Sequence, residues 1–172
     1  MSPMDVEVRS WLRNEADTLA FGRRLGSLLR AGDWVALTGD LGSGKTTLVA
    51  GALETMRPGA HVRSPTYVLV EVYPGLPAII HADLYRVGSS EEALRLGLED
   101  LAERDAVVLV EWADRAPDVL APDRLEVELR FPQEGVLGRE VRFRPRGERW
   151  ESLVRGGALD RERWHDALYP GN

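Results

Sequence analysis

The sequence predicts an α/β fold of three layers, with a central sheet that mixes parallel and antiparallel strands. A short apolar run at 34–38 passes through a glycine-rich stretch into helix-compatible residues, which is a strand–loop–helix order. A second run, 107–110, is continuously apolar and rich in valine, as is typical of a strand buried on both faces. Segments 68–81 and 124–144 each have the pattern of two strands joined by a turn, and such hairpins are antiparallel.

The glycine-rich stretch is the most informative part of the chain. Residues 39–46 (GDLGSGKT) match the phosphate-loop pattern G-x-x-x-x-G-K-[ST] at every position. The glycines allow backbone N–H groups to turn inward, and the start of the following helix adds a partial positive charge. We expect Lys45 to reach the β- and γ-phosphates of a nucleoside triphosphate and the Thr46 hydroxyl to bind the bridging magnesium ion. The motif in this setting predicts a P-loop NTPase-like fold.

Lysine usage supports this interpretation. Lys45 is the only lysine in the chain, and the rest of its 22 basic residues are arginines. A compact ammonium on a flexible stem acts as a point charge between phosphate oxygens, whereas a guanidinium is a wide planar fork. The one lysine of the chain therefore lies at the position of the motif where an ammonium is needed to contact phosphate.

Composition bounds the class of protein. A length of 172 residues with 44% hydrophobic content suits one domain, which we assign to 1–172 with 147–172 as a short helical tail. The net charge of −6 argues against a DNA-binding protein or a general nucleic-acid binder, so any contact with RNA is expected to be local or through a partner. The sequence has no cysteine, no apolar run long enough to span a membrane and no signal-peptide pattern, so we expect a cytoplasmic protein without membrane contact.

The first third of the chain predicts an edge strand and two helices. Alternation at 6–9 indicates a weak edge strand, and Asn14 followed by Asp17 is typical of a helix start. Phe21, Leu25, Leu28 and Leu29 form the apolar stripe of that helix, and glycine at position 32 ends it. The helix that follows the phosphate loop is expected to run to about Met56, before the stop signal 57–59.

The middle of the chain predicts a hairpin followed by an interrupted helix. Strands at 68–73 and 78–81 are separated by a Pro-Gly turn, and Asp83 lies just past the second strand. Ser89 and Glu92 form a capping box for the helix, which Gly97 interrupts or ends.

The last third predicts a buried strand, a second hairpin and the tail. The buried strand 107–110 ends in Glu111-Trp112, which resembles the end of a Walker B strand. Strand 124–130 alternates apolar and charged residues, so we expect an antiparallel strand with one face in water, followed by a strand at 139–144. Trp150 and Trp164 mark two short amphipathic helices in the tail.

Several side chains are candidates for phosphoryl-transfer chemistry, which needs a magnesium site, an oriented nucleophile and neutralisation of charge. Glu111 is the candidate for holding magnesium, and Asp83 for orienting or deprotonating a water, although a turn aspartate would look the same. Thr66 is a candidate switch residue that would contact the γ-phosphate, and Arg86 or Arg139 is a candidate for stabilising the developing charge.

The three histidines lack metal-ligand spacing and are interpreted as structural or surface residues. Trp11 is expected either to stack on adenine or to pack against the first helix.

Four motifs together resemble one known family. They are the phosphate loop, 64–67 (SPTY), 81–86 (HADLYR) and 111–112 (EW), and in this order they resemble the TsaE (formerly YjeE) ATPase family of bacterial threonylcarbamoyladenosine tRNA modification. The resemblance implies an ATP hydrolase that uses ATP and Mg²⁺, binds the heterodimer of TsaB and TsaD, and supports repeated turnover. It also implies that tRNA is a partner only indirectly, because TsaD is the protein that modifies the tRNA.

The resemblance also assigns roles to residues. It implies that Lys45, Asp83 and Glu111 are catalytic, that Thr46 and Glu111 bind the metal, and that Ser64, Pro65 and Thr66 form a switch. The implied nucleotide-binding residues are Trp11, Glu15, Asp40, Leu41, Gly42, Ser43, Gly44, Lys45, Thr46, Thr47 and Arg139.

Two other functions remain open at this point. A small-molecule kinase would use the same loop and a mobile lid, for which the arginine-rich stretch 139–146 is the candidate, although its strand-like alternation argues against a lid. A non-catalytic module would use the nucleotide only to order 64–67 for a partner. A guanine-specific Asn-Lys-x-Asp motif is excluded because there is no second lysine, which favours ATP.

Overall fold

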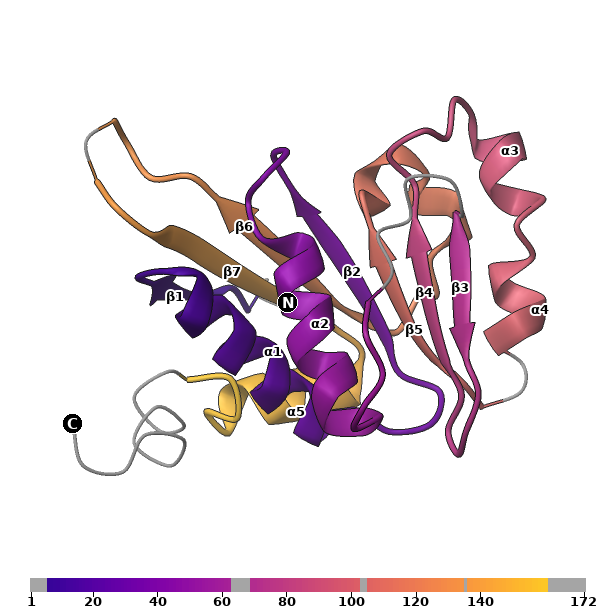
Figure 1. Cartoon of the computed structure of the whole chain (residues 1–172), viewed down its shortest axis with the longest axis horizontal. Helices are drawn as coiled ribbons and strands as arrows, with labels where there is room; N and C mark the ends of the chain where they lie inside the picture. Colours follow the sequence, from indigo (N-terminus) through magenta and orange to yellow (C-terminus); the bar gives the residue numbers. More distant parts are fainter. Residues whose placement is uncertain (1–5, 63–68, 103–104, 135, 161–172) are drawn as a thin grey trace, which may run out of the picture.

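The computed structural model describes residues 6–62, 69–102, 105–134 and 136–160. Seven strands form one sheet in the order β1-β7-β6-β2-β5-β4-β3 (Figure 1). The central strands β6, β2, β5 and β4 are parallel to one another, whereas β7 and β1 at one side and β3 at the other are antiparallel to their neighbours. The expected α/β fold with a mixed sheet is therefore confirmed.

Most strand bounds follow the sequence patterns closely, but the first strand was expected at 6–9 and runs from Val8 to Leu12. The strand bounds are β1 Val8–Leu12, β2 Trp34–Gly39, β3 Val70–Tyr73, β4 Ile79–Asp83, β5 Val107–Glu111, β6 Arg124–Arg130 and β7 Arg139–Arg146. Every residue of β5 is buried, as its continuous apolar run predicted. The carboxyl ends of β2, β4 and β5 lie at the same edge of the sheet, at the top of Figure 1, because these strands are parallel.

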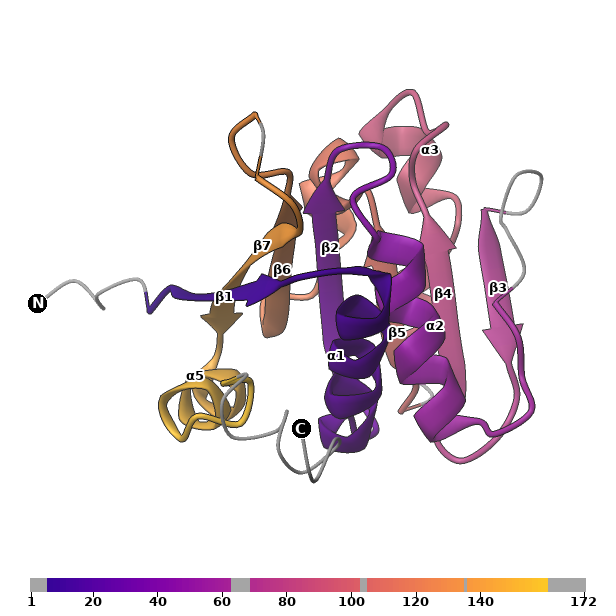
Figure 2. The same cartoon turned by 60° about the vertical axis from the view of Figure 1, so that its left-hand side comes forward.

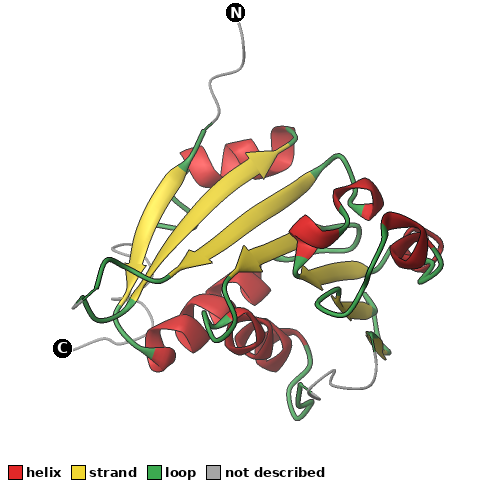
Figure 3. Ribbon diagram, turned by 90° about the horizontal axis from the view of Figure 1, so that it is seen from above, coloured by secondary structure: helices red, strands yellow, loops and turns green. Residues whose placement is uncertain are grey.

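Helices cover the sheet on both faces. The helices are α1 Glu15–Leu28, α2 Lys45–Met56, α3 Ser90–Leu94, α4 Leu98–Ala102 and α5 Glu148–Arg155, with short 3₁₀ helices at Ala113–Arg115 and Pro117–Val119. One apolar core lies between the sheet and α1, α2 and α5, and a second lies on the opposite face beneath α3, α4 and the 3₁₀ helices. Figures 2 and 3 show this arrangement from the side and from above. None of the described helices is long and apolar enough to cross a membrane.

Helix starts and interruptions agree with their sequence signals. The side chain of Asn14 accepts a hydrogen bond from the backbone N–H of Asp17, which caps α1. The hydroxyl of Ser89 accepts from the N–H of Glu92 and caps α3. Gly97 has a φ of 67° between α3 and α4, so the predicted interruption is present.

One strand differs from its prediction. The strand β6 was expected to be antiparallel, and it is antiparallel to β7 but parallel to β2. Alternating burial reports how many faces of a strand are covered, and it says nothing about the direction of each neighbour. The chain reaches β6 from β5 by a crossover through the two 3₁₀ helices, and a crossover of this kind returns the chain in a parallel direction.

The tail contributes to the first core. The helix α5 lies where the first tail helix was predicted, and it buries Trp150 and Val154 against the core that α1 and α2 cover. Arg149 anchors it by an ion pair to Asp33, at 2.7 Å, and by a hydrogen bond to the carbonyl of Leu28. The second predicted tail helix, around Trp164, lies outside the described residues.

Candidate functional site

The phosphate loop connects a buried strand to a helix, as the motif requires. The loop leaves β2 at Gly39, where an added Cβ would lie 2.2 Å from the carbonyl oxygen of Leu129, so no side chain fits. It ends at Gly44, whose φ of 105° caps α2 in a conformation that favours glycine. The backbone N–H groups at this end of α2 have no side-chain cap. They are available to an anion, which the helix dipole also favours.

Lys45 lies inside this loop. Its ammonium donates to the carbonyl oxygens of Gly39, at 2.6 Å, and Asp40, at 2.9 Å, and only 4% of the residue is exposed. The indole of Trp112 covers it, with the ring centroid 4.0 Å from Nζ. Burial lowers the pKa of the Lys45 ammonium below its ordinary value of 10.5, and the negative charges of Glu111 and Asp83 offset part of that shift.

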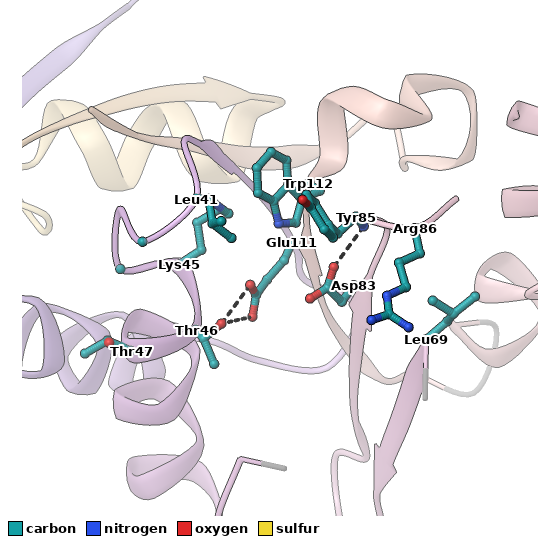
Figure 4. Close-up of a pocket in the computed structure, with 12 residues that line it drawn as sticks. Leu41, Lys45, Thr46, Thr47, Leu69, Asp83, Tyr85, Arg86, Glu111 and Trp112 are labelled. Atoms are coloured by element: carbon teal, nitrogen blue, oxygen red, sulfur yellow. Dashed lines mark hydrogen bonds between the residues drawn. The ribbon is translucent and has the colours of Figure 1, made fainter. Parts of the chain in front are cut away.

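Glu111 and Thr46 are in direct contact next to the phosphate loop. Glu111 is the last residue of β5 and is 2% exposed, while Thr46 is the second residue of α2. The Thr46 hydroxyl lies 3.0 Å from Oε1 and 2.9 Å from Oε2 of Glu111, so it donates to the carboxylate (Figure 4). This hydrogen bond joins two residues that are 65 positions apart in the chain. It links α2, which follows the phosphate loop, to β5, whose last residue is predicted to hold magnesium.

Asp83 faces the same pocket from the neighbouring strand. It is the last residue of β4 and lies opposite Glu111 in the parallel register. Its Oδ1 accepts from the backbone N–H of Tyr85 at 2.9 Å, which fixes the carboxylate. Burial raises the pKa of Asp83 above its ordinary value of 3.8; the Tyr85 hydrogen bond lowers it, and the negative charge of Glu111 raises it again.

These side chains line one pocket of about 400 Å³ (Figure 4). Lys45 and Thr46 enter it from the loop, and Asp83 and Glu111 from the strand ends. The pocket is completed by the following residues, which include four further predicted nucleotide contacts and Arg86: Leu41, Gly42, Gly44, Thr47, Leu69, Tyr85, Arg86 and Trp112. An ammonium, a hydroxyl and two carboxylates thus converge on one space, which is the set that phosphoryl transfer requires.

A smaller pocket of about 270 Å³ lies on the other side of the loop. Glu15 and Arg139, both predicted to contact the nucleotide, line it together with Ser43 and Thr47. The Arg139 guanidinium stacks on the ring of Phe131, with 4.3 Å to the centroid, and one of its nitrogens lies 3.5 Å from the carbonyl oxygen of Gly42. The structure therefore brings these two distant residues to the phosphate loop.

Trp11, Asp40 and the predicted switch stand apart from these two pockets. The ring of Trp11 lies so close to Gly138 that an added Cβ there would be 2.9 Å from its atoms, so the ring packs beside β7. The carbonyl of Asp40 receives Lys45, while the residue also lines a pocket on the opposite face of the sheet. The switch residues Ser64, Pro65 and Thr66 lie outside the described residues.

Sequence reasoning missed two contributors to the site. His81 was interpreted as structural or surface, but its Nε2 lies 2.8 Å from Oε1 of Glu111. Its place two residues before Asp83 on one strand was the available signal, because alternate residues share a face. Trp112 was quoted only as part of a motif, and no pattern predicted its left-handed φ of 56°, which is costly for a residue with a Cβ.

The donor set suits magnesium bound mainly through a nucleotide. In the part of the chain that the structure describes, no group of three or more His, Cys, Asp or Glu residues is arranged to hold a metal ion. What the site offers is one hydroxyl, from Thr46, and one buried carboxylate, from Glu111. Mg²⁺ binds hard oxygen ligands and commonly takes only one or two from protein, with waters and phosphates completing its shell, so these residues fit it.

Comparison with known proteins places the chain in a family. Residues 12–141 match the family model described as "Threonylcarbamoyl adenosine biosynthesis protein TsaE". The chain is 40% identical over 139 residues to a TsaE protein of Streptomyces coelicolor, covering 75% of this chain and 90% of that one, and 33% identical over 141 residues to one of Bacillus subtilis, covering 81% and 87%. The crystal structure of Bacillus subtilis YdiB superimposes with a TM-score of 0.75 at 28% identity, covering 94% of this chain and 99% of that one.

Proposed function

Because the chain belongs to the TsaE family of tRNA threonylcarbamoyladenosine biosynthesis proteins, we propose that it is a magnesium-dependent ATP hydrolase of that pathway. We further propose that it acts with the heterodimer of TsaB and TsaD and supports repeated turnover by that complex. The observation that carries the proposal is the contact between the Thr46 hydroxyl and the Glu111 carboxylate, next to the loop that holds the only lysine. A phosphate loop and a buried strand-end carboxylate joined in this way form a nucleotide and magnesium site.

Each side chain then has a defined task. Lys45 binds the β- and γ-phosphates, and the free N–H groups at the start of α2 bind phosphate oxygens. Thr46 and Glu111 would hold the metal with the hydroxyl and carboxylate oxygens that meet in the pocket. Bound magnesium supplies neutralisation of the charge that develops on the phosphate oxygens.

Asp83 is the candidate for orienting the attacking water. Its carboxylate is fixed by the Tyr85 N–H and lies beside Glu111 at the pocket wall. Its raised pKa makes it a better proton acceptor than an ordinary aspartate, since a carboxylate that resists ionisation binds a proton more readily. Among the described residues the hydrogen bond to the Asp83 carboxylate comes from the Tyr85 N–H and uses Oδ1, which leaves Oδ2 for the water.

The segment 139–146, the candidate lid of a small-molecule kinase, is a strand of the sheet in this structure. Arg139 to Arg146 form β7, which pairs with β1 on one side and β6 on the other. Its arginines are also held by carboxylates: Arg142 lies 3.0 Å from Glu140, and Arg144 lies 2.7 Å from Glu7. A strand paired on both edges does not close over a substrate, so we favour water as the phosphoryl acceptor.

The proposal is tested by measuring ADP release from ATP and magnesium, with and without the TsaB–TsaD heterodimer. We expect the heterodimer to raise the rate, and Lys45→Ala or Glu111→Ala to lower the stimulated rate by at least about 100-fold, the cost of removing a charge-stabilising group. Arg23→Ala is a matched control, because it removes only an exposed ion pair with Glu54 on the surface of α1. A rate that ignored the heterodimer but rose with a small-molecule acceptor would replace the hydrolase with a kinase. No ADP beyond one equivalent would indicate a nucleotide-gated binding module.

A further inference from the structure

His81 is a polar side chain in the interior of the sheet. It occupies the third position of β4, only 2% exposed, between residues that are apolar and equally buried: Ile79, Ile80 and Ala82. Burying a polar group costs free energy unless hydrogen bonds replace its contacts with water. An aliphatic residue would satisfy the packing at this position, so the imidazole calls for a specific partner.

That partner is Glu111. The Nε2 atom of His81 lies 2.8 Å from Oε1 of Glu111, and both side chains are at least 98% buried. The other ring nitrogen, Nδ1, is buried and has no hydrogen-bond partner among the described residues. A carboxylate accepts hydrogen bonds and does not donate them, so the Nε2–H of His81 donates to Glu111. Among the described residues, the ring therefore makes its hydrogen bond to this one carboxylate.

Strand register explains how the two residues meet. The strands β4 and β5 are parallel, with His81 opposite Leu109 and Asp83 opposite Glu111. Because alternate residues of a strand share a face, His81, Asp83, Leu109 and Glu111 all project toward the helix α2. His81 thus lies below the pocket, one step deeper than Asp83, and reaches Glu111 diagonally from the buried side.

Glu111 is consequently held from two directions. The Thr46 hydroxyl contacts the carboxylate from the pocket side, and His81 contacts Oε1 from the core side. A side chain with three rotatable bonds would otherwise sample several positions at the end of the strand. Hydrogen bonds from neighbouring side chains commonly fix the orientation of a metal-binding carboxylate, and removing them weakens metal binding by about 10- to 100-fold.

We propose that His81 is a positioning residue that fixes the Glu111 carboxylate in the orientation required for the magnesium of a bound nucleotide. This inference rests on the proposed nucleotide and magnesium site. In this role His81 contacts neither nucleotide nor metal, and it acts only through Glu111.

The test compares variants that differ in their ability to donate to Glu111. His81→Leu removes the donor, His81→Gln places an amide N–H where Nε2 was, and His81→Asn keeps an amide that is too short to reach. Ile79→Val is the matched packing control, because it trims the same face of the same strand without touching Glu111. The readout is binding of the fluorescent nucleotide mant-ADP, titrated with magnesium and repeated in excess EDTA.

We expect His81→Leu and His81→Asn to raise the magnesium concentration at half-saturation about tenfold or more, with binding in EDTA unchanged. His81→Gln and Ile79→Val should remain close to wild type. If His81→Leu fails to fold, the comparison of Gln with Asn still decides the question.

Two results would overturn the inference while leaving the proposed site intact. One is a wild-type magnesium requirement in His81→Leu, and the other is a Gln variant as impaired as the Asn variant. Wild-type nucleotide binding that does not respond to magnesium would instead remove the proposed site itself, and the positioning role with it.

Discussion

At the scale of single residues, burial disfavours the ionised form of Asp83. Its pKa is raised above 3.8, chiefly by burial, so ionising this carboxyl costs the folded chain more free energy than it costs the unfolded chain. We expect Asp83→Asn to increase the free energy of unfolding at pH 7 while abolishing ADP release. The amide oxygen of asparagine still accepts from the Tyr85 N–H, so the loop geometry is kept.

The pH dependence of this gain has a defined sign. Below pH 3.8 the carboxyl is protonated in both the folded and the unfolded chain, so the wild type pays no penalty there. The advantage of Asp83→Asn should appear as the pH rises through the folded-state pKa and stay constant above it. Urea titrations of both proteins from pH 4 to pH 8 measure it, and a variant less stable than wild type at pH 7 would contradict the assignment.

At the scale of elements, α1 and α2 pack closely because glycines face each other. An added Cβ on Gly51 would lie 2.2 Å from the carbonyl oxygen of Leu19, and one on Gly22 would lie 2.1 Å from that of Leu48. Backbone atoms cannot move aside as a flexible side chain can. This contact places the start of α2, and therefore Lys45 and Thr46, against the rest of the fold.

Gly51→Ala measures this contact. Replacing glycine with alanine inside a helix normally stabilises it by about 1 kcal/mol. Here the steric clash should prevail, with a net loss of about 1–3 kcal/mol in the free energy of unfolding from urea titration. Gly88→Ala is the control, because its nearest neighbour is the end of the Glu92 side chain at 3.5 Å. Equal stability of Gly51→Ala and wild type would show that the helices are not in close contact.

The same scale shows how far the sequence predicts the fold. The bounds of α2, the cap at Asn14 and the buried strand β5 all follow from local signals, because glycines, capping side chains and apolar runs act within a few residues. The parallel pairing of β6 with β2 does not follow, since it depends on a crossover and not on any residue within the strand.

The candidate site divides in the same way. Lys45 and Thr46 are predicted by a contiguous motif, and Glu111 by the end of an apolar strand. The contact of His81 with Glu111 joins two strands 30 residues apart, so it needs the register of the sheet before it can be recognised. The placement of Trp112 over Lys45 depends on a left-handed backbone that no local pattern required.

At the scale of the whole molecule, the sheet separates two kinds of surface. Its upper edge in Figure 1 collects the ends of β2, β4 and β5, where the phosphate loop and both carboxylates lie. The strands β6 and β7 carry arginine–glutamate pairs: Arg124 with Glu126, Arg142 with Glu140, and Arg144 with Glu7, which precedes β1. Their side chains are between 17% and 36% exposed, so water still reaches these pairs and weakens each one.

The solitary, buried Lys45 also gives the molecule a single point of attack by a lysine-specific protease. Cleavage after Lys45 would produce only two fragments, 1–45 and 46–172. Because Lys45 is 4% exposed and held by two carbonyl groups, the bond after it is protected until the loop opens or the chain unfolds. We expect slow cleavage of the folded protein, faster cleavage of Gly51→Ala in proportion to its larger unfolded fraction, and none of Lys45→Arg, as followed by gel electrophoresis. Rapid cleavage of the wild type would show that the loop opens by itself. Cleavage of the one peptide bond that follows Lys45 therefore reports whether the phosphate loop is folded.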